Sequence, residues 1–299
     1  MTSAHPTPHQ HEHAHHEHTD DLLDWDLRGE TLEREAELDL GWIEQALDWV
    51  AAGTGSSGHP VELAVDLGSG PGVAAAAIAT AFPGARVTAV DGSQALLDRA
   101  VARAQRLGLG DRVDTLLQDL SADLSQLPSS DLLWISKVMH HLPDPGATLA
   151  ALRHRLRPGG RIGIVEGGLP VRWAPEDLGI GRPGLQARLD VAVGEAMLAL
   201  PEPHGIRPGT DWAGLLRAAG FTEVATRSWL DEVAAPAPEA VRARVRDRLT
   251  ISHDRLGALL DPHDRSVVER LLDPAEPLGI DRRSDLFWLT AQTVHTGRA

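Results

Sequence analysis

The stretch VDLGSGPG at residues 65–72 decides the fold, because it connects an apolar run to the start of a helix. The run at 61–67 predicts a buried strand, and the small residues at 73–82 predict a helix that lies close to a sheet. Glycine is used where the backbone approaches a ligand or takes a positive φ, and a helix N-terminus offers free N–H groups. A ligand site is therefore expected at this turn.

The spacing of the glycines limits which class of ligand the turn can bind. A dinucleotide-binding turn reads G-x-G-x-x-G, whereas this turn has Gly68, Gly70 and Gly72, with Val73 in the third place of that pattern. A pyrophosphate site is thus disfavoured, and a nicotinamide oxidoreductase stays only as an alternative.

Apolar runs alternate with amphipathic helices on both sides of this turn. Strands are expected at 61–67, 86–90, 112–118, 131–136, 161–166, 221–230 and 285–295. Helix N-caps are expected at Ser93, Asp144 and Thr210. This alternation predicts an α/β fold built on a parallel sheet.

The chain divides into parts of different composition. Residues 1–20 are polar and rich in histidine, which predicts a disordered tail; metal binding by its imidazoles, a solvated tail and a purification remnant all stay open. Residues 21–58 predict a helical cap, and 59–299 form the main domain. Glycines and prolines around one helix at about 167–209 predict an insertion that acts as a lid.

Composition excludes several kinds of function. A formal net charge of -15 argues against nucleic acids and anionic membranes as partners. Without cysteine there is no disulfide or thiolate, and without tyrosine a general base must be histidine, a carboxylate, the single lysine or water. No signal peptide and no apolar run of about 18 residues is found, so a cytoplasmic location is expected.

Five motifs, in order along the chain, resemble those of a known protein family. Asp66 with the three glycines is followed by VTAVDGS at 87–93, LLQDL at 116–120, DLLWISKVMHHLPDP at 131–145 and LRPGGRIGIVE at 156–166. This series resembles the class I S-adenosylmethionine-dependent methyltransferases. The resemblance implies a Rossmann-like fold, with a seven-stranded mixed sheet whose last strand is antiparallel and helices on both faces.

The resemblance also implies which residues bind S-adenosylmethionine. Asp91 stands where the family binds the ribose hydroxyls, Asp119 and Leu120 where it binds adenine, and Ser136 where it meets the amino group. Asp91 as a helix cap and Asp119 as a solvated turn residue stay as alternatives. The full implied set is Asp66, Gly68, Gly70, Gly72, Asp91, Gly92, Asp119, Leu120 and Ser136.

His140, His141 and Glu166 are the candidate catalytic residues, because they follow the fourth strand or close the fifth. Histidine titrates near neutrality, which suits a base. Structural hydrogen bonding by the histidines and buried ion pairing by Glu166 stay open. Lys137 is interpreted as solvated rather than catalytic. No metal is expected; a site formed by the two histidines and Asp144 is the alternative.

The predicted function is methyl transfer to an O, N or C atom of a small molecule, with a role in secondary metabolism. A catalytically silent S-adenosylmethionine-binding or interaction protein is the alternative, and a homodimer stays open. Acceptor contacts are expected from the N-terminal helices and from the insertion at 167–209, with stacking by tryptophan as one mode, while core packing of the tryptophans and solvated surface for the arginines stay open. The residues considered for this are Trp173, His204, Trp212, Arg172, Arg182 and Arg188.

Overall fold

The computed structural model describes residues 25–55, 60–121, 124–199 and 209–299. The predicted tail at 1–20 and His204 lie outside these ranges. The division into cap, main domain and lid stays a prediction.

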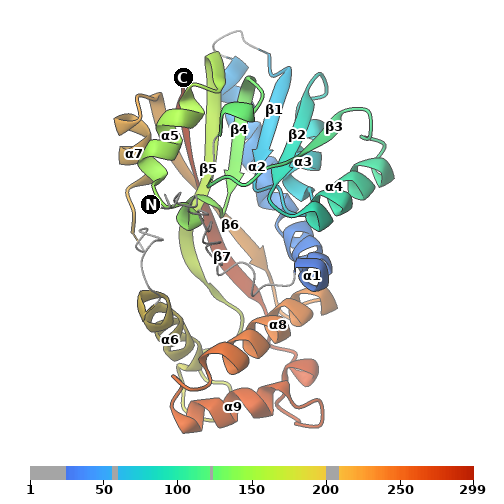
Figure 1. Cartoon of the computed structure of the whole chain (residues 1–299). Coiled ribbons are helices and arrows are strands. Elements are labelled where there is room, and N and C mark those ends of the chain that lie inside the picture. Colours follow the sequence, from blue (N-terminus) through green and yellow to red (C-terminus); the bar gives the residue numbers. More distant parts are fainter. Residues whose placement is uncertain (1–24, 56–59, 122–123, 200–208) are drawn as a thin grey trace, which may run out of the picture.

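Within the described residues, seven strands form a single mixed sheet (Figure 1). They are β1 (Leu63–Leu67), β2 (Arg86–Asp91), β3 (Val113–Leu117), β4 (Ser130–Ser136), β5 (Leu156–Arg172), β6 (Thr222–Val233) and β7 (Trp288–Arg298). Their order across the sheet is β3-β2-β1-β4-β5-β7-β6. Only β7 runs antiparallel to its neighbours, β5 and β6. The expected Rossmann-like fold with an antiparallel last strand is confirmed.

Helices cover both faces of this sheet. The helices of the described residues are α1 (Trp25–Leu38), α2 (Leu40–Gly55), α3 (Val73–Ala81), α4 (Gln94–Arg106), α5 (Pro145–Arg153), α6 (Leu185–Ala199), α7 (Trp212–Ala218), α8 (Glu239–Leu256) and α9 (Pro262–Leu272), of which α6, α8 and α9 lie beyond the sheet. One core lies between the sheet and α2, α3 and α4, and another between the sheet and α5 and α7. The buried alanines of α3 let that helix lie close to the sheet, as its sequence predicts.

Side-chain caps fix where the helices begin. The Ser93 Oγ accepts from Leu96 N at 3.4 Å, and the Asp144 Oδ1 accepts from Ala147 N at 2.9 Å, so both expected caps are confirmed. The expectation for Thr210 is wrong by one residue. The Asp211 carboxylate caps α7 instead, since its charge interacts favourably with the helix N-terminus.

β5 does not end at Glu166, as the sequence led us to expect, but continues to Arg172. Gly167 and Gly168 have φ of 77° and 125°, and the register against β7 shifts between Val165 and Gly168. A Cβ on Gly168 would lie 1.9 Å from the Ala291 carbonyl oxygen, so only glycine fits this bulge. The predicted insertion at 167–209 therefore begins as a strand rather than as a loop.

A further core lies beyond the ends of β5 and β7, where α6, α8 and α9 pack together (Figure 1). The sequence analysis placed no helix at α9, although Asp261 caps it and Pro262 occupies its first turn. No helix within the described residues is long and apolar enough to cross a bilayer.

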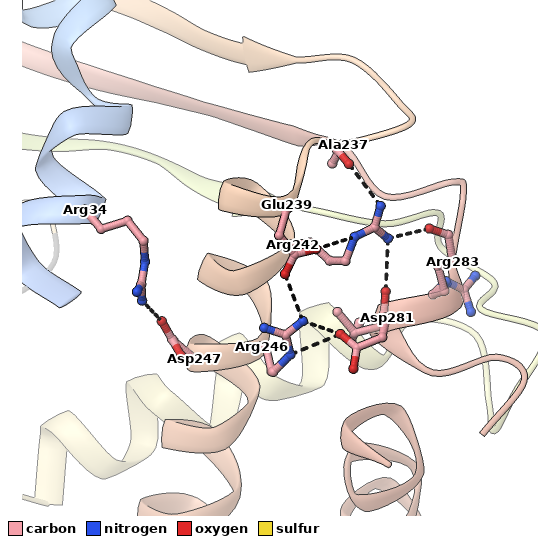
Figure 2. A network of polar contacts seen from close by, with 9 residues as sticks. Arg34, Ala237, Glu239, Arg242, Arg246, Asp247, Asp281 and Arg283 are labelled. Carbon is pink, nitrogen blue, oxygen red and sulfur yellow. Dashed lines mark hydrogen bonds and ion pairs between the residues drawn. The ribbon is translucent and has the colours of Figure 1, made fainter. Parts of the chain in front are cut away.

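Arginines attach α8 to its surroundings, as Figure 2 shows. The Arg34 guanidinium of α1 pairs with the Asp247 carboxylate of α8 at 2.5 Å. Arg242 donates to the Arg283 carbonyl at 2.6 Å, and Arg246 pairs with Asp281 in the short helix η4 (Ile280–Arg282). These contacts join the first helix of the described chain to the segment that leads into β7.

Candidate active site

The glycine turn after β1 has a fixed backbone with one open side. Gly68, Gly70 and Gly72 take φ of 68°, 52° and 76°. A Cβ on Gly68 would lie 2.3 Å from Val138 Cγ2, and one on Gly72 would lie 2.5 Å from Ala100 Cβ. At Gly70, by contrast, no atom lies within 4 Å of such a Cβ. The turn therefore packs tightly on two sides and leaves room beside Gly70.

Asp91, at the end of β2, is held by this turn. Its Oδ2 accepts from Gly70 N at 2.8 Å and its Oδ1 accepts from Ser93 N at 2.9 Å. A carboxylate oxygen can accept more than one hydrogen bond. Since Ser93 caps α4 with its own hydroxyl, Asp91 is not the cap of that helix. Gly92, the next residue, is exposed beside it.

Asp66, in β1 behind the turn, is an ionisable group without a charge partner. Burial, followed by the charge of Asp91, raises the pKa of its carboxyl to about 7. Its Oδ2 is buried and has no hydrogen-bond partner among the described residues. An N–H or ammonium donor arriving here would satisfy that oxygen. The site therefore has an acceptor ready for a positively polarised group.

The segment after β3 forms the next wall. Asp119 is exposed, and its Oδ1 accepts from the backbone N and the hydroxyl of Ser121 at 2.8 and 2.7 Å. Leu120 lines a small apolar hollow of about 10 Å³ together with Leu67 and Val138. Ser136, half-buried at the end of β4, pairs in the sheet with Val165. Carboxylates, backbone and an apolar hollow thus meet at one edge of the sheet.

His140 and Glu166 form a pair at the same edge. The His140 Nδ1 lies 3.1 and 3.0 Å from the two oxygens of the buried Glu166 carboxylate, and His140 N donates to Glu166 Oε1 at 3.3 Å. With Nδ1 donating, the neutral ring has its lone pair on Nε2. His141 is exposed, with its ring centroid 4.0 Å from that of His140. The contact with Glu166 thus distinguishes His140 from His141.

His295, in β7, supports Glu166 from the other side. Its Nε2 donates to the Glu166 carbonyl at 3.3 Å, and its Nδ1 accepts from the Thr226 hydroxyl at 2.9 Å. Burial is the largest cause that lowers the pKa of this imidazole, so it is neutral near pH 7. A neutral ring satisfies both contacts at once, because one nitrogen donates and the other accepts.

Comparisons with known proteins show what this chain is similar to. A methyltransferase domain model matches residues 65–162. A release factor glutamine methyltransferase of Gloeobacter violaceus is 34% identical over 177 residues, which is 55% of this chain and 58% of that protein. A ubiquinone biosynthesis O-methyltransferase of Xylella fastidiosa is 35% identical over 117 residues, 39% of this chain and 45% of that protein. The chain spans between 24% and 58% of the length of the curated relatives it matches.

A solved Nostoc punctiforme structure assigned as an O-methyltransferase shares the fold. It matches with a TM-score of 0.50 and 16% identity, covering 68% of this chain and 56% of that one. The domain match covers residues 65–162 of the 299 residues, and the strand order is that of the class I methyltransferase fold. The chain shares this fold and is similar to a methyltransferase domain. The S-adenosylmethionine cofactor expected from the sequence agrees with that similarity.

Lys137, which follows β4, is not simply solvated. It has a φ of 58°, its backbone N donates to the Val165 carbonyl at 3.0 Å, and its Nζ pairs with Asp39 Oδ2 at 3.2 Å. Asp39 is buried between α1 and α2, and its Oδ1 accepts from Arg244 of α8 at 3.0 Å. Asp39 therefore connects the helices of the predicted cap to the end of β4 and to α8.

Other residues considered for the acceptor have structural partners. Trp173 and Trp212 are buried in cores, so neither presents its ring to an acceptor. Arg182 and Arg188 pair with Asp264 of α9 at 3.1 and 2.6 Å, and Arg172 pairs with Glu176. Within the described ranges, no group of three histidines and carboxylates is placed to hold a metal ion.

Sequence reasoning missed His295, Thr226 and Asp39. Alternation in the last two strands predicts which of their residues share a face, but the register of β7 against β5 and β6 comes only from the assembled sheet. Asp39 lies at the junction of two helices, where an acidic residue looks like surface. No local signal distinguishes it from its exposed neighbours.

Proposed function

We propose that the protein transfers a methyl group from S-adenosylmethionine to a hydroxyl oxygen of a small molecule, and that His140 accepts the hydroxyl proton. The observation that carries this proposal is the His140–Glu166 pair, which lies at the sheet edge that also holds the glycine turn and Asp91. The net charge of -15 favours a small molecule over a nucleic acid as the acceptor.

The described residues fit the cofactor. The Asp91 carboxylate is the kind of acceptor that suits ribose hydroxyls, Leu120 offers an apolar contact for a ring, and the Asp66 Oδ2, which has no partner among the described residues, suits the electrostatics of an amino group. The turn leaves space beside Gly70. When bound, S-adenosylmethionine supplies a methyl group activated by a positively charged sulfur.

Glu166 orients the proposed base. Its buried carboxylate accepts from His140 Nδ1–H, which fixes the ring and leaves Nε2 to take the acceptor's proton. The same carboxylate stabilises the imidazolium that forms when the proton arrives. His295 holds the Glu166 backbone at the bulge of β5, so the carboxylate keeps its direction.

A hydroxyl is the acceptor that this arrangement favours, because an alcohol or phenol keeps its proton near neutral pH and benefits from a base. The curated relative from Xylella fastidiosa is named as an O-methyltransferase, and that name supports an oxygen acceptor. The role in secondary metabolism, the cytoplasmic location and the homodimer stay predictions.

Calorimetry followed by turnover tests the proposal. The full chain is titrated with S-adenosylmethionine and S-adenosylhomocysteine, and then incubated with a panel of phenols, alcohols and amines. We expect binding of both compounds and methylation within the hydroxyl group of the panel. Absence of binding contradicts the function, and binding without turnover on any acceptor favours a catalytically silent binding protein.

A further inference from the structure

We infer that the open face of β5, β7 and β6 beyond Glu166 binds the acceptor, and that the acceptor is an uncharged molecule with an apolar skeleton of about two rings. This inference rests on the proposed function and names the substrate class of the same site. It is carried by a strip of side chains, called here the β5–β7–β6 strip. Its members are Leu169, Thr226, Ser228, Leu230, Ala291, Thr293 and His295.

The register places the strip on a single face. Leu169 of β5 and Leu230 of β6 are both opposite Ala291 of β7. Residues opposite each other in an antiparallel pair point to the same side. Next along β7, the Thr293 hydroxyl lies 2.8 Å from that of Ser228. The following position is His295, which contacts Thr226 and Glu166. The strip is thus continuous with the proposed catalytic pair.

At its far end the strip is apolar. Leu169 and Leu230 are 64% and 58% exposed, whereas Ala291 between them is small and only 8% exposed. Two long apolar side chains therefore flank a short one, and we call the position of Ala291 between the two leucines the trough. With strands about 4.8 Å apart, Leu169 and Leu230 lie roughly 10 Å apart, and the five residues of β7 from Ala291 to His295 span roughly 14 Å. These dimensions suit a molecule of about two rings with its hydroxyl toward His140.

The glycine bulge leaves this face open on its β5 side. Gly167 and Gly168 are exposed and add no side chain between Glu166 and Leu169. Because a Cβ on Gly168 would collide with the Ala291 carbonyl, the sequence at this point is fixed by the backbone. A ligand on the strip can therefore approach the main chain next to Glu166.

Charge selects against an anionic acceptor. On the described strands, Glu166 lies at one end of the strip, while Glu232 and Arg172 are both opposite Leu289 at the other. Arg172 is paired with Glu176. Between these ends the strip carries hydroxyls, aliphatic side chains and the neutral His295. A carboxylate on the acceptor would meet no free cation here, and the Glu166 charge would repel it.

A neutral fluorescent dye tests the strip. N-phenyl-1-naphthylamine is titrated into the full chain and into Leu169→Ser, Leu230→Ser and Ala291→Leu. Removing one leucine contact should raise the dye Kd by about tenfold, and filling the trough at Ala291 should raise it further. The matched control is Leu107→Ser, at the end of α4, where the leucine is 54% exposed and lies outside the strip. Its dye Kd should equal that of the wild type.

A pair of competitors with the same rings tests the charge argument. 2-Naphthol should displace the dye at a concentration at least tenfold lower than 2-naphthoate. Equal displacement by the two overturns the assignment of an uncharged acceptor. An unchanged dye Kd in both serine variants overturns the strip as the site, and so does a concentration-dependent dimer, seen by light scattering, that Leu230→Ser abolishes.

Calorimetry with S-adenosylmethionine on the same proteins keeps the two proposals apart. A wild type that binds the dye on the strip but not the cofactor contradicts the proposed function alone. Variants that bind cofactor normally and also bind the dye normally contradict the strip alone. Circular dichroism of each variant confirms that it is folded, and the two serine variants suffice if Ala291→Leu does not fold.

Discussion

The contacts that hold the candidate site differ in sequence range between the half of the sheet formed by β1–β4 and the half formed by β5–β7. In the first half, the contact between Gly70 and Asp91 joins residues 21 apart in the sequence. In the second, Thr226 and His295 are 69 residues apart, and His295 and Glu166 are 129 apart. Short-range contacts leave a local sequence pattern, whereas long-range contacts exist only once the sheet is assembled.

The two halves also present different groups at the site. The first offers backbone N–H groups and a glycine turn, with Asp91 held by two of those N–H groups. The second offers side chains on the face of long strands, with the β5–β7–β6 strip and Glu166 as its polar end. A cofactor site made largely of backbone constrains sequence strongly, while an acceptor site made of side chains can change without altering the fold.

The largest expected effect is that of His140→Gln, which should lower turnover without weakening cofactor binding. Glutamine keeps a polar side chain but cannot take a proton, so kcat should fall by about 10²–10⁴-fold. The Kd for S-adenosylmethionine should stay unchanged, because Asp91 and the glycine turn are intact. Steady-state kinetics and calorimetry on one preparation measure both quantities.

The neighbouring His141→Gln variant is the control for His140→Gln. His141 has the same chemistry and is exposed, whereas the His140 Nδ1 lies 3.1 and 3.0 Å from the two Glu166 carboxylate oxygens. We expect turnover close to that of the wild type. Equal losses in the two variants would show that the Glu166 contact does not select the base.

Asp39→Ala should remove the ion pairs that join the end of β4 to α8. Asp39 pairs with Lys137 at the end of β4 and with Arg244 of α8, and it is buried. Its removal leaves the buried Arg244 guanidinium without this carboxylate, which should lower the free energy of unfolding by about 3 kcal/mol. Urea denaturation measures the loss. Asp48→Ala, an exposed position on α2, is the control, and a loss as large there would contradict the role of Asp39.

The same contrast explains how much the sequence predicted. The glycine turn, Ser93 and the antiparallel last strand were predictable, because each belongs to a short motif or to a family pattern. The continuation of β5 was not, since Gly167 and Gly168 look like a loop but form a bulge that only the Ala291 carbonyl explains. α9 had its signals in Asp261 and Pro262, yet besides the neighbouring α8 its partners include Arg182 and Arg188, which are far away in the chain.

Asp66 makes the free energy of unfolding depend on pH, which the sequence motif around it does not reveal. Its folded pKa is about 7, against an ordinary value of 3.8, so between these values the folded protein holds a proton that the unfolded chain has lost. Stability from this group is therefore present at low pH and is lost as pH rises toward 7. From pH 5 to 7 the loss should be on the order of 2–3 kcal/mol.

The measurement is urea denaturation of the protein without cofactor at pH 5 and pH 7.5, compared with Asp66→Asn. The variant cannot ionise at this position, so its stability should fall less than that of the wild type over this interval. Other acids titrate equally in both proteins and cancel in the difference. Identical pH slopes for the two proteins would contradict the raised pKa of Asp66.

The smallest expected effect is that of Asp91→Ala, which tests whether cofactor and dye bind to separate halves of the sheet. The variant removes the acceptor of the Gly70 N–H together with the lone pairs proposed for the ribose hydroxyls, so the Kd for S-adenosylmethionine should rise by at least about tenfold. The dye Kd on the β5–β7–β6 strip should not change, because the strip shares no hydrogen bond with Asp91 among those described. Asp98→Ala, exposed on α4, controls for loss of negative charge nearby. If Asp91→Ala weakened the dye and the cofactor alike, the two halves would act as one site, and the separation between backbone-held cofactor and side-chain-held acceptor would have to be abandoned.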